Sequence, residues 1–322
     1  FNSLTTLCTG GYLAEYNFVD GSALSPSTFG VTDTSTGRWI PKTLSGITYG
    51  TNGFRLKFQD SSALGDDTSG NGNDLSATNL ASTDQTTDSP TQNFMVKDKT
   101  RVIGTAPTME EGNLKVVYNS GSGYPAIRAG KEIPQSGKWY WEVKCTHTGG
   151  VQGISNPSMG VIDLNIKDIV DFSTGSPFSR QSGGMGSEFW GGFKFTGLLS
   201  TSIDFTIGSD VIANNDYMLF AFDMDNGKAW WGWNDSSAGS SVVWFANDGG
   251  TDGDPSTGVN PTVTFNPSSH RFVPTQGGFA PGSGYPATFE FNFGSKTYDF
   301  TAPTGFNGLS QNNFPETSKG IS

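Results

Sequence analysis

Two loops of this sequence are rich in the oxygen atoms that bind hard cations. Residues 66–74 read Asp-Asp-Thr-Ser-Gly-Asn-Gly-Asn-Asp, and residues 247–254 read Asn-Asp-Gly-Gly-Thr-Asp-Gly-Asp. Ca²⁺ takes about six to eight oxygen ligands in flexible geometry, and glycines allow tight bends around the ion. The alternative is that Asp and Asn only form turns here. Ca²⁺ is therefore the candidate cofactor, and its candidate ligands are Asp66, Asp67, Asp248, Asp252 and Asp254.

Aromatic side chains are abundant, with 24 Phe, 9 Tyr and 8 Trp in 322 residues. Those that alternate along expected strands should face a core, namely Trp139, Trp141, Phe289, Phe291 and Phe293. An aromatic ring on a loop can instead stack on a sugar or anchor a protein partner, unless it folds back over the core or packs on a neighbouring subunit. The candidate ligand-binding residues are Phe189 and Trp190 in a glycine-rich stretch, Tyr285 in a turn, and Trp230, which faces away from Trp231 and Trp233.

The usual catalytic signatures are missing. Neither Gly-x-Ser-x-Gly, Gly-x-Gly-x-x-Gly nor Gly-Lys-Ser/Thr occurs, so the usual nucleophile elbow and phosphate loops are not encoded. Glu142 and Glu290 have no partner carboxylate two or four residues away, and we interpret them as exposed strand charges. Cys145 and His147 share a strand face, but we interpret Cys145 as a small buried hydrophobe. We therefore expect no enzymatic activity and no catalytic residues.

The charge balance restricts the partners further. The chain has 19 basic and 30 acidic residues and a net charge of −11, which disfavours non-specific binding to nucleic acid or anionic lipid. Its longest apolar run, residues 217–222, is far shorter than the ~18 residues that a membrane span needs. We therefore expect neither nucleic-acid binding nor membrane insertion. Because the first residue is Phe1, we also expect the chain to begin inside a longer product.

Short strands joined by turns are typical of a chain with 44 Gly and few charged residues. The apolar pattern predicts strands at 12–19, 53–60, 137–145, 217–225, 228–233, 241–246 and 287–293, and the one at 217–225 is continuously apolar. Asn226-Gly227 lies between two of these strands and predicts a hairpin with a type I′ turn. Residues 164–172 give the only hint of a helix, of about two turns at most. Residues 61–93 are nearly all small and polar, which predicts a long loop or linker.

One hexapeptide, Gly-Ser-Gly-Tyr-Pro-Ala, occurs at residues 121–126 and again at 282–287. The simpler interpretation is two similar turns that lead into strands. The alternative is two related loops on one rim of the fold that form a single surface.

Several segments, taken in order, resemble a known family. They are Gly-Lys-Trp-Tyr-Trp-Glu-Val at 137–143, Met-Gly-Val-Ile-Asp at 159–163, Asp-Val-Ile at 210–212, Phe-Ala-Phe-Asp-Met-Asp-Asn-Gly at 220–227, Phe-Asn-Phe-Gly at 291–294 and Pro-Thr-Gly-Phe at 303–306. Over roughly residues 96–314 the chain resembles the SPRY domain in the form common in bacteriophage virion proteins. Residues 11–21 resemble the closing strand of a laminin-G-like jelly roll, which often precedes SPRY in such proteins. The stretches at 163–209 and 235–266 depart from the family pattern.

The resemblance implies an all-β fold. It would be a concanavalin-like antiparallel β-sandwich (SPRY) preceded by a small β segment and a polar linker. The implied divisions are 1–60 for the β segment and connector, 61–95 for the linker, 96–314 for the sandwich and 315–322 for a tail.

The resemblance also implies a function. It is that of a non-enzymatic structural protein on the exterior of a virion, such as a fibre or receptor-binding component. Such a component attaches to a host surface glycan or protein through sandwich loops, contacts other virion proteins and forms homo-oligomers, often trimers. Two alternatives stay open: a capsid or tail decoration module that binds another virion protein, and a glycan-cleaving enzyme whose carboxylates meet only in the folded chain.

Overall fold

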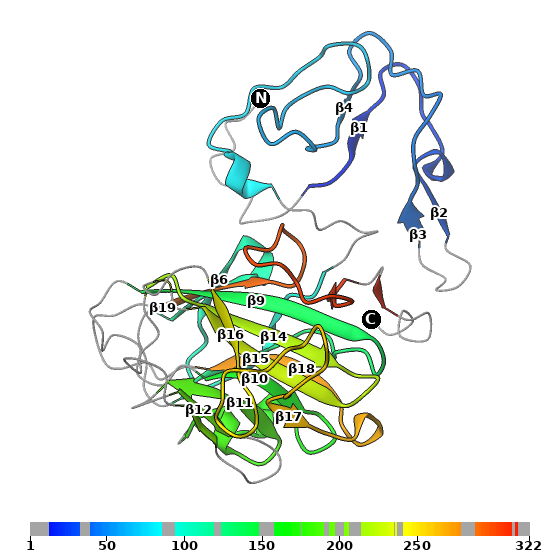
Figure 1. Ribbon diagram of the computed structural model, residues 1–322. Coiled ribbons are helices and arrows are strands. Elements are labelled where there is room, and N and C mark those ends of the chain that lie inside the picture. The colour runs from blue at the N-terminus through cyan, green and yellow to red at the C-terminus, as the bar shows by residue number, and fades with distance from the viewer. Residues whose placement is uncertain are drawn as a thin grey trace. The chain divides into compact units, whose positions relative to one another are not determined.

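The computed structural model describes residues 13–32, 39–85, 94–118, 124–147, 158–174, 176–189, 193–196, 203–205, 214–234, 236, 241–277, 287–310 and 313–314 (Figure 1). The chain divides between Asn93 and Phe94 into two compact units. In the described ranges, no helix has the length and apolar character needed to cross a membrane.

Two short antiparallel ribbons form the strands of the first unit. β1 (Tyr16–Phe18) pairs with β4 (Phe54–Leu56), and β2 (Gly30–Thr32) pairs with β3 (Trp39–Pro41). Two 3-10 turns, η1 (Pro26–Thr28) and η2 (Ser82–Asp84), accompany them. The strand predicted at 53–60 ends at Leu56, because Phe58 has a φ of 54°, a left-handed value that is incompatible with an extended strand.

Side-chain hydrogen bonds, rather than a large core, order the polar stretch after β4. Gln85 Nε2 donates to the carbonyl oxygens of Phe58 at 2.6 Å and Gln59 at 2.8 Å. Asn71 Nδ2 donates to the carbonyl oxygen of Gly53 at 2.9 Å. Residues 61–85 of the expected linker are thus fastened to the first unit by specific contacts, whereas Phe94 and Met95 belong to the second unit.

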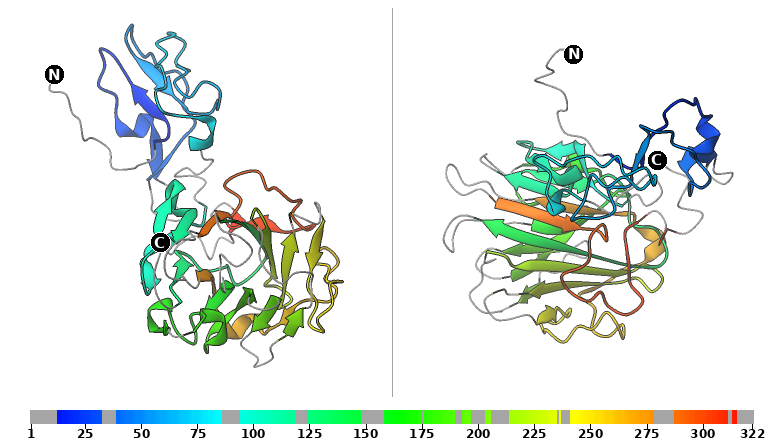
Figure 2. Two further views of the ribbon diagram at one scale, coloured as in Figure 1. Left: turned by 90° about the vertical axis from the view of Figure 1, so that its left-hand side faces the viewer. Right: turned by 90° about the horizontal axis from the view of Figure 1, so that it is seen from above.

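Two facing sheets form the second unit (Figures 1 and 2). The seven-stranded sheet has the order β13-β12-β11-β10-β18-β8-β5. Its strands are β5 (Lys97–Ile103), β8 (Ala126–Ala129), β10 (Ser158–Asp163), β11 (Gly184–Phe189), β12 (Phe193–Thr196), β13 (Ile203–Phe205) and β18 (Phe272–Gly277).

The nine-stranded sheet has the order β16-β15-β14-β9-β19-β7-β6, with β17 paired to β15 and β20 to β9. Its strands are β6 (Thr108–Glu110), β7 (Lys115–Tyr118), β9 (Lys138–His147), β14 (Tyr217–Asp223), β15 (Lys228–Asn234), β16 (Val242–Trp244), β17 (Val263–Thr264), β19 (Ala287–Asn292) and β20 (Asn307–Gly308). The described 3-10 turns of this unit are η3 (Glu111–Asn113), η4 (Ile169–Asp171), η5 (Phe178–Arg180) and η6 (Pro267–Ser269).

Aromatic rings fill the space between the two sheets. All five predicted core rings are buried, namely Trp139, Trp141, Phe289, Phe291 and Phe293. Trp231 Nε1 of β15 donates to the carbonyl oxygen of Met159 in β10 at 3.3 Å, which ties one sheet to the other. The predicted all-β, antiparallel sandwich class is confirmed, since every described strand pair in both sheets is antiparallel except β20 with β9.

The outer face of the nine-stranded sheet is also covered, which the sequence did not predict. Residues 298–306, here called the outer strap, contact this face: Tyr298 Oη donates to the carbonyl oxygen of Tyr140 at 3.1 Å. The apolar cluster between the strap and the sheet is built on Tyr140, Leu219, Ala221 and Trp230 of the sheet and Phe306 of the strap. Strands β9, β14 and β15 are therefore buried on both faces.

The predicted hairpin of β14 and β15 is present, but its turn differs from the prediction. The strands stay in register until Asp223 pairs with Lys228, which leaves a loop of four residues. Gly227 has a φ of 64°, whereas Asn226 does not have a positive φ, so the type I′ prediction was wrong. The Asp223 carboxylate instead accepts hydrogen bonds from Asn226 N at 3.1 Å and Nδ2 at 2.9 Å, which close the loop. The helix hinted at 164–172 is limited to the single 3-10 turn η4.

Candidate functional site

Strand ends from both sheets meet at one end of the sandwich. In the nine-stranded sheet, Ala287 at the start of β19 pairs with Tyr118 and His147, the last residues of β7 and β9. In the seven-stranded sheet, Gly277 at the end of β18 pairs with Ala126 at the start of β8.

A buried hydrogen bond joins the sheets at this end. Tyr118 Oη donates to Gln276 Oε1 at 3.1 Å, and both side chains are buried. Gln276 precedes Gly277, so the bond connects the two groups of strand ends directly. We call this end the Tyr118 rim and define it by Tyr118, Ala126, Ser158, Gly277 and Ala287.

Both copies of the repeated hexapeptide lead into strands that begin at the Tyr118 rim. Ala126, the last residue of the first copy, begins β8, and Ala287, the last residue of the second, begins β19. One copy therefore precedes a strand of each sheet. Residues 121–123 and 282–286, which hold most of both copies, lie outside the described residues.

The candidate ligand-binding residue Phe189 ends β11 at the same rim. Ser158, at the start of β10, pairs with Glu188, and Phe189 pairs with Phe193 at the start of β12. The backbone of Phe189 is described, but its side chain is not. Trp190 and Tyr285 also lie outside the described residues, so ligand contact by these three residues stays a prediction.

Trp230 is a correction to the predicted ligand-binding set. Its side chain is completely buried beneath the outer strap, where its ring meets the Phe306 ring at 6.4 Å between centroids. Its Nε1 donates to the carbonyl oxygen of Val259 at 2.9 Å. A ring so enclosed cannot stack on a ligand from solvent. The prediction failed because the strap covers the face that strand alternation assigns to Trp230.

Glu142 is a second correction, because it is buried rather than exposed. Its Oε1 accepts hydrogen bonds from Tyr140 Oη at 2.7 Å and Phe300 N at 3.0 Å, and its Oε2 accepts one from Asp299 N at 3.0 Å. Burial raises the pKa of the Glu142 carboxyl, against the opposing effect of these hydrogen bonds. Both oxygens are thus occupied in holding the outer strap on β9.

Cys145 is a buried hydrophobe, as predicted. It is free and completely enclosed between the sheets, and burial raises the pKa of its thiol well above the ordinary value. A thiol in this setting stays protonated and is a poor nucleophile. The side chain of His147, its imagined partner, lies outside the described residues.

In the first acidic loop, the Asp67 carboxylate stabilises the local fold through hydrogen bonds. Its carboxylate accepts hydrogen bonds from the N–H groups of Arg55 and Ser69 at 2.8 Å and Asn73 at 2.9 Å, and from Ser69 Oγ at 2.9 Å. Desolvation raises the pKa of Asp67, but these hydrogen bonds outweigh it and lower the pKa to about 2. The carboxylate is therefore already saturated by donors.

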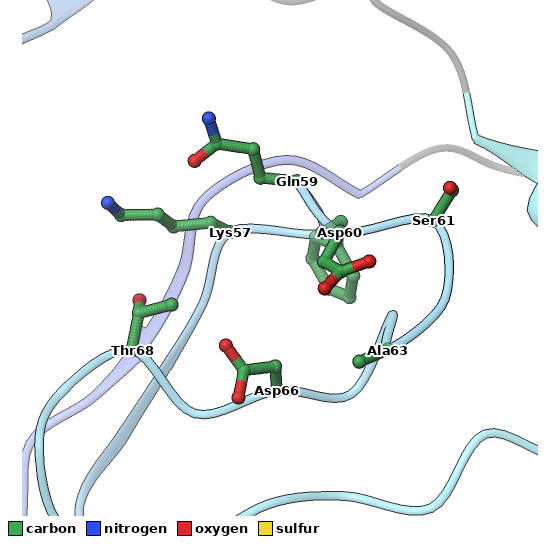
Figure 3. A pocket seen from close by; sticks show the side chains of 8 residues that line it. Lys57, Gln59, Asp60, Ser61, Ala63, Asp66 and Thr68 are labelled. Atoms are coloured by element: carbon green, nitrogen blue, oxygen red, sulfur yellow. The ribbon is translucent and has the colours of Figure 1, made fainter.

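Its neighbour Asp66 lies instead at an open depression of about 430 Å³ (Figure 3). The depression is lined by Lys57, Phe58, Gln59, Asp60, Ser61, Ala63, Asp66 and Thr68. Figure 3 shows Lys57 to Ser61 along one side and Ala63 to Thr68 along the other. The lining is polar and open to solvent, so it lacks the enclosed apolar wall typical of an organic cofactor site.

In the second acidic loop, Asp248 and Asp254 cap their own turns, and Asp252 is bonded to a residue eight positions further on. Asp248 Oδ1 accepts from Gly250 N at 2.9 Å, Asp252 Oδ2 from Asn260 Nδ2 at 2.9 Å, and Asp254 Oδ2 from Thr257 Oγ1 at 2.7 Å. Within the part of the chain that the structure describes, no group of three or more His, Cys, Asp or Glu side chains is arranged to hold a metal ion. Ca²⁺ binding by either loop stays a prediction.

An Asp–His pair that sequence reasoning missed lies at the opposite end of the sandwich from the Tyr118 rim. His270 Nδ1 is 2.7 Å from Oδ2 of the buried Asp163, and the His270 ring stacks on Phe272 at 5.4 Å between centroids. Such a carboxylate can fix an imidazole tautomer, as in catalytic triads. Among the described residues no hydroxyl or thiol hydrogen bonds to this ring. The two residues are 107 positions apart, and no motif spacing links them.

Comparison with known proteins identifies no family for this chain: no family model and no curated protein sequence matches it. Solved structures similar to the chain include the SPRY domain of human HERC1, with a TM-score of 0.37 and 14% identity over 61% of this chain and 96% of that domain. They also include lectin II from Ulex europaeus, with a TM-score of 0.37 and 9% identity over 62% of this chain and 99% of the lectin. A third is the Emp47p carbohydrate recognition domain, with a TM-score of 0.36 and 10% identity over 63% of this chain and 97% of that domain. These scores lie below 0.5, so the fold assignment depends on the strand pairing described above.

Proposed function

We propose that this chain is a non-enzymatic binding module that attaches to a surface glycan or protein through the connections at the Tyr118 rim. More specifically, we propose that it is a structural protein on the exterior of a bacteriophage virion, such as a fibre or receptor-binding component. It would act as a homo-oligomer, such as a trimer, beside other virion proteins. The observation that carries the proposal is the meeting of strand ends from both sheets at this rim. The virion assignment is supported by the sequence resemblance alone.

Two connections at this rim are long for an antiparallel sandwich, whereas the β11–β12 connection that holds Trp190 has three residues. Residues 148–157 join β9 to β10, and residues 278–286 join β18 to β19, each across the two sheets, whereas connections in compact domains have a median of about four to six residues. Long connections on a rigid scaffold are where binding residues concentrate. Trp190 follows β11 of the seven-stranded sheet, and Tyr285 precedes β19 of the nine-stranded sheet. The Tyr118–Gln276 bond fixes these two sheets to each other.

The two alternatives differ from this proposal in observable ways. A retaining or inverting glycosidase needs two carboxyl groups about 5–10 Å apart beside its substrate. Of the two strand glutamates considered, Glu142 is buried with both oxygens occupied, which disfavours it as a catalytic acid. A decoration module, in contrast, predicts a virion partner and no binding to host cells.

The test is binding of the purified chain to intact candidate host cells and to a glycan array, with and without EDTA. Trp190→Ala and Tyr285→Ala should each reduce the affinity at least tenfold if their rings contact the ligand. Ile166→Ala is the matched control, because Ile166 is an exposed apolar residue in the connection after the other end of β10. It should leave binding unchanged.

Each outcome separates the alternatives. Saturable binding without loss of glycan supports attachment, and sensitivity to EDTA supports the predicted Ca²⁺ sites. Release of sugar fragments from the array supports the enzyme. Absence of binding at every Ca²⁺ concentration overturns the attachment role and favours the decoration module.

A further inference from the structure

Lys97 is a lysine in the interior of the second unit, at the start of β5. Only 1% of the residue is exposed. Its Nζ lies 4.0 Å from the centroid of the Phe291 ring and 3.4 Å from the carbonyl oxygen of Pro274. A buried ammonium group normally needs a paired charge or several short hydrogen bonds, and a ring face with one distant carbonyl supplies neither. Burial accordingly lowers the pKa of Lys97 well below its ordinary value.

The carboxylates on the surrounding 3-10 turns are engaged elsewhere. Asp168, which precedes η4, pairs with Arg128 at 2.6 Å and with Arg101 at 3.3 Å. Glu111 of η3 lies 3.1 Å from Lys296 Nζ. Asp171, at the end of η4, is exposed to solvent.

The strands beside Lys97 offer it no counter-charge either. On β5 itself, Asp98 Oδ1 accepts hydrogen bonds from the backbone N and Oγ1 of Thr100. On β19, Glu290 alternates with Phe291 and therefore faces the other side of the sheet. Strand β18 and residues 306–310 contain no charged residue.

Lys97 lies where the chain enters the second unit. Met95 N donates to the carbonyl oxygen of Leu309 at 2.9 Å, and Gly130 N donates to that of Val96 at 2.9 Å. Beyond Lys97 the pairing of β5 with β8 is interrupted until Val102. The segment 94–97 is therefore held by a few hydrogen bonds and by the burial of two side chains, those of Met95 and Lys97.

We propose that Lys97 is a pH-responsive anchor for residues 94–97: with a neutral amine the segment stays packed on the sandwich, and uptake of a proton releases it. The direction follows from linkage. A group whose pKa is depressed in the folded state contributes its full stability above its ordinary pKa, here 10.5, and loses that contribution as the pH falls towards the depressed value. Opening of the segment therefore increases as the solution becomes less alkaline.

The test compares the wild-type chain with Lys97→Met and Lys99→Met by amide hydrogen exchange between about pH 6 and pH 9.5, corrected for intrinsic rates. The reporters are the Met95 and Gly130 amides, with the Phe220 amide in the middle of β14 as reference. In the wild type, the opening constant of the reporters should rise by about tenfold for each unit that the pH falls, until the depressed pKa is reached. Lys97→Met should abolish this dependence, whereas Lys99→Met, which alters an exposed lysine of the same strand, should preserve it.

Two results would overturn the proposal. One comes from hydrogen exchange: the wild-type opening constant does not change with pH, or its pH dependence persists in Lys97→Met. The other is an NMR titration of the Lys97 side-chain carbon in the wild type that follows the ordinary lysine range. The second measurement needs no variant, so it decides the question even if Lys97→Met fails to fold.

Discussion

At the scale of single residues, two adjacent carboxylates of the first unit have different roles although the sequence treats them alike. Asp67 accepts four hydrogen bonds, three from its own loop and one from Arg55 N in β4, whereas Asp66 is exposed at the depression. We expect Asp67→Asn to destabilise the first unit by about 1–3 kcal/mol, because an amide nitrogen cannot accept from backbone N–H groups. Asp66→Asn, the matched control, should change the stability by less than about 0.5 kcal/mol. Hydrogen exchange of residues 50–75 measures both.

The lowered pKa of Asp67 also predicts that its loop opens in acid. The pKa of Asp67 is lowered to about 2 from an ordinary 3.8, so its contribution is complete above pH 3.8 and is lost as the pH falls through about 2. The wild-type loop should lose protection against exchange over this interval. Asp67→Asn should start with less protection and lose less of it on acidification. Equal acid sensitivity of the two proteins would contradict the assignment.

In the second unit, the Glu142 carboxylate holds the outer strap on β9. In Glu142→Gln the amide oxygen can still accept hydrogen bonds from Tyr140 Oη and Phe300 N. The amide nitrogen then replaces the oxygen that accepts from Asp299 N, so two hydrogen-bond donors face each other. We expect Glu142→Gln to cost about 1–3 kcal/mol of unfolding free energy and to increase exchange in the outer strap. Glu290→Gln, at a partly exposed position of β19, is the control and should have little effect. Urea titration checks the prediction, and equal stability of the two variants would refute it.

At the scale of elements, the β14–β15 hairpin depends on one glycine. Gly227 has a φ of 64°, and a Cβ added there would lie 2.0 Å from the carbonyl oxygen of Phe265. We expect Gly227→Ala to cost about 2–4 kcal/mol, from left-handed strain together with steric overlap. Gly305 has a φ of 83° with open space around it, so Gly305→Ala should cost only the conformational part, about 1 kcal/mol. Similar midpoints for the two variants in urea would show that the overlap relaxes at no cost.

Elements with regular alternation were predictable from the sequence, and those fixed by distant contacts were not. Strand β9 places Trp139, Trp141, Val143 and Cys145 at every second position, so its inward face was clear from period 2 alone. The burial of Glu142 was not, because its partners in the outer strap are 157 and 158 residues away and the strap itself is rich in polar and turn-forming residues. Trp230 was misassigned for the same reason. For the candidate site, the sequence shows which residue types are present. That the two strands following the hexapeptide copies, β8 and β19, begin at the same rim is shown only by the sheet pairing.

At the scale of the whole molecule, the two units have very different interiors. Among the described residues of the first unit, only Tyr49, Leu56 and Leu64 are buried apolar side chains, and Tyr16 and Phe18 stack on Phe54 with close to half of their surface exposed. The second unit has a large core between its sheets and a second cluster beneath the outer strap. Since hydrophobic stabilisation scales with buried apolar area, the first unit should be much the less stable of the two.

We therefore expect urea to unfold the chain in two steps. Pulse-labelling hydrogen exchange should show peptides that contain Tyr49 and Leu56 opening at lower urea than peptides from β9 and β14, because a unit held mainly by exposed hydrogen bonds has little apolar area to lose. Asp67→Asn should shift only the first transition, and Gly227→Ala only the second. A single coincident transition, moved by both substitutions, would mean that the two units unfold as one cooperative body.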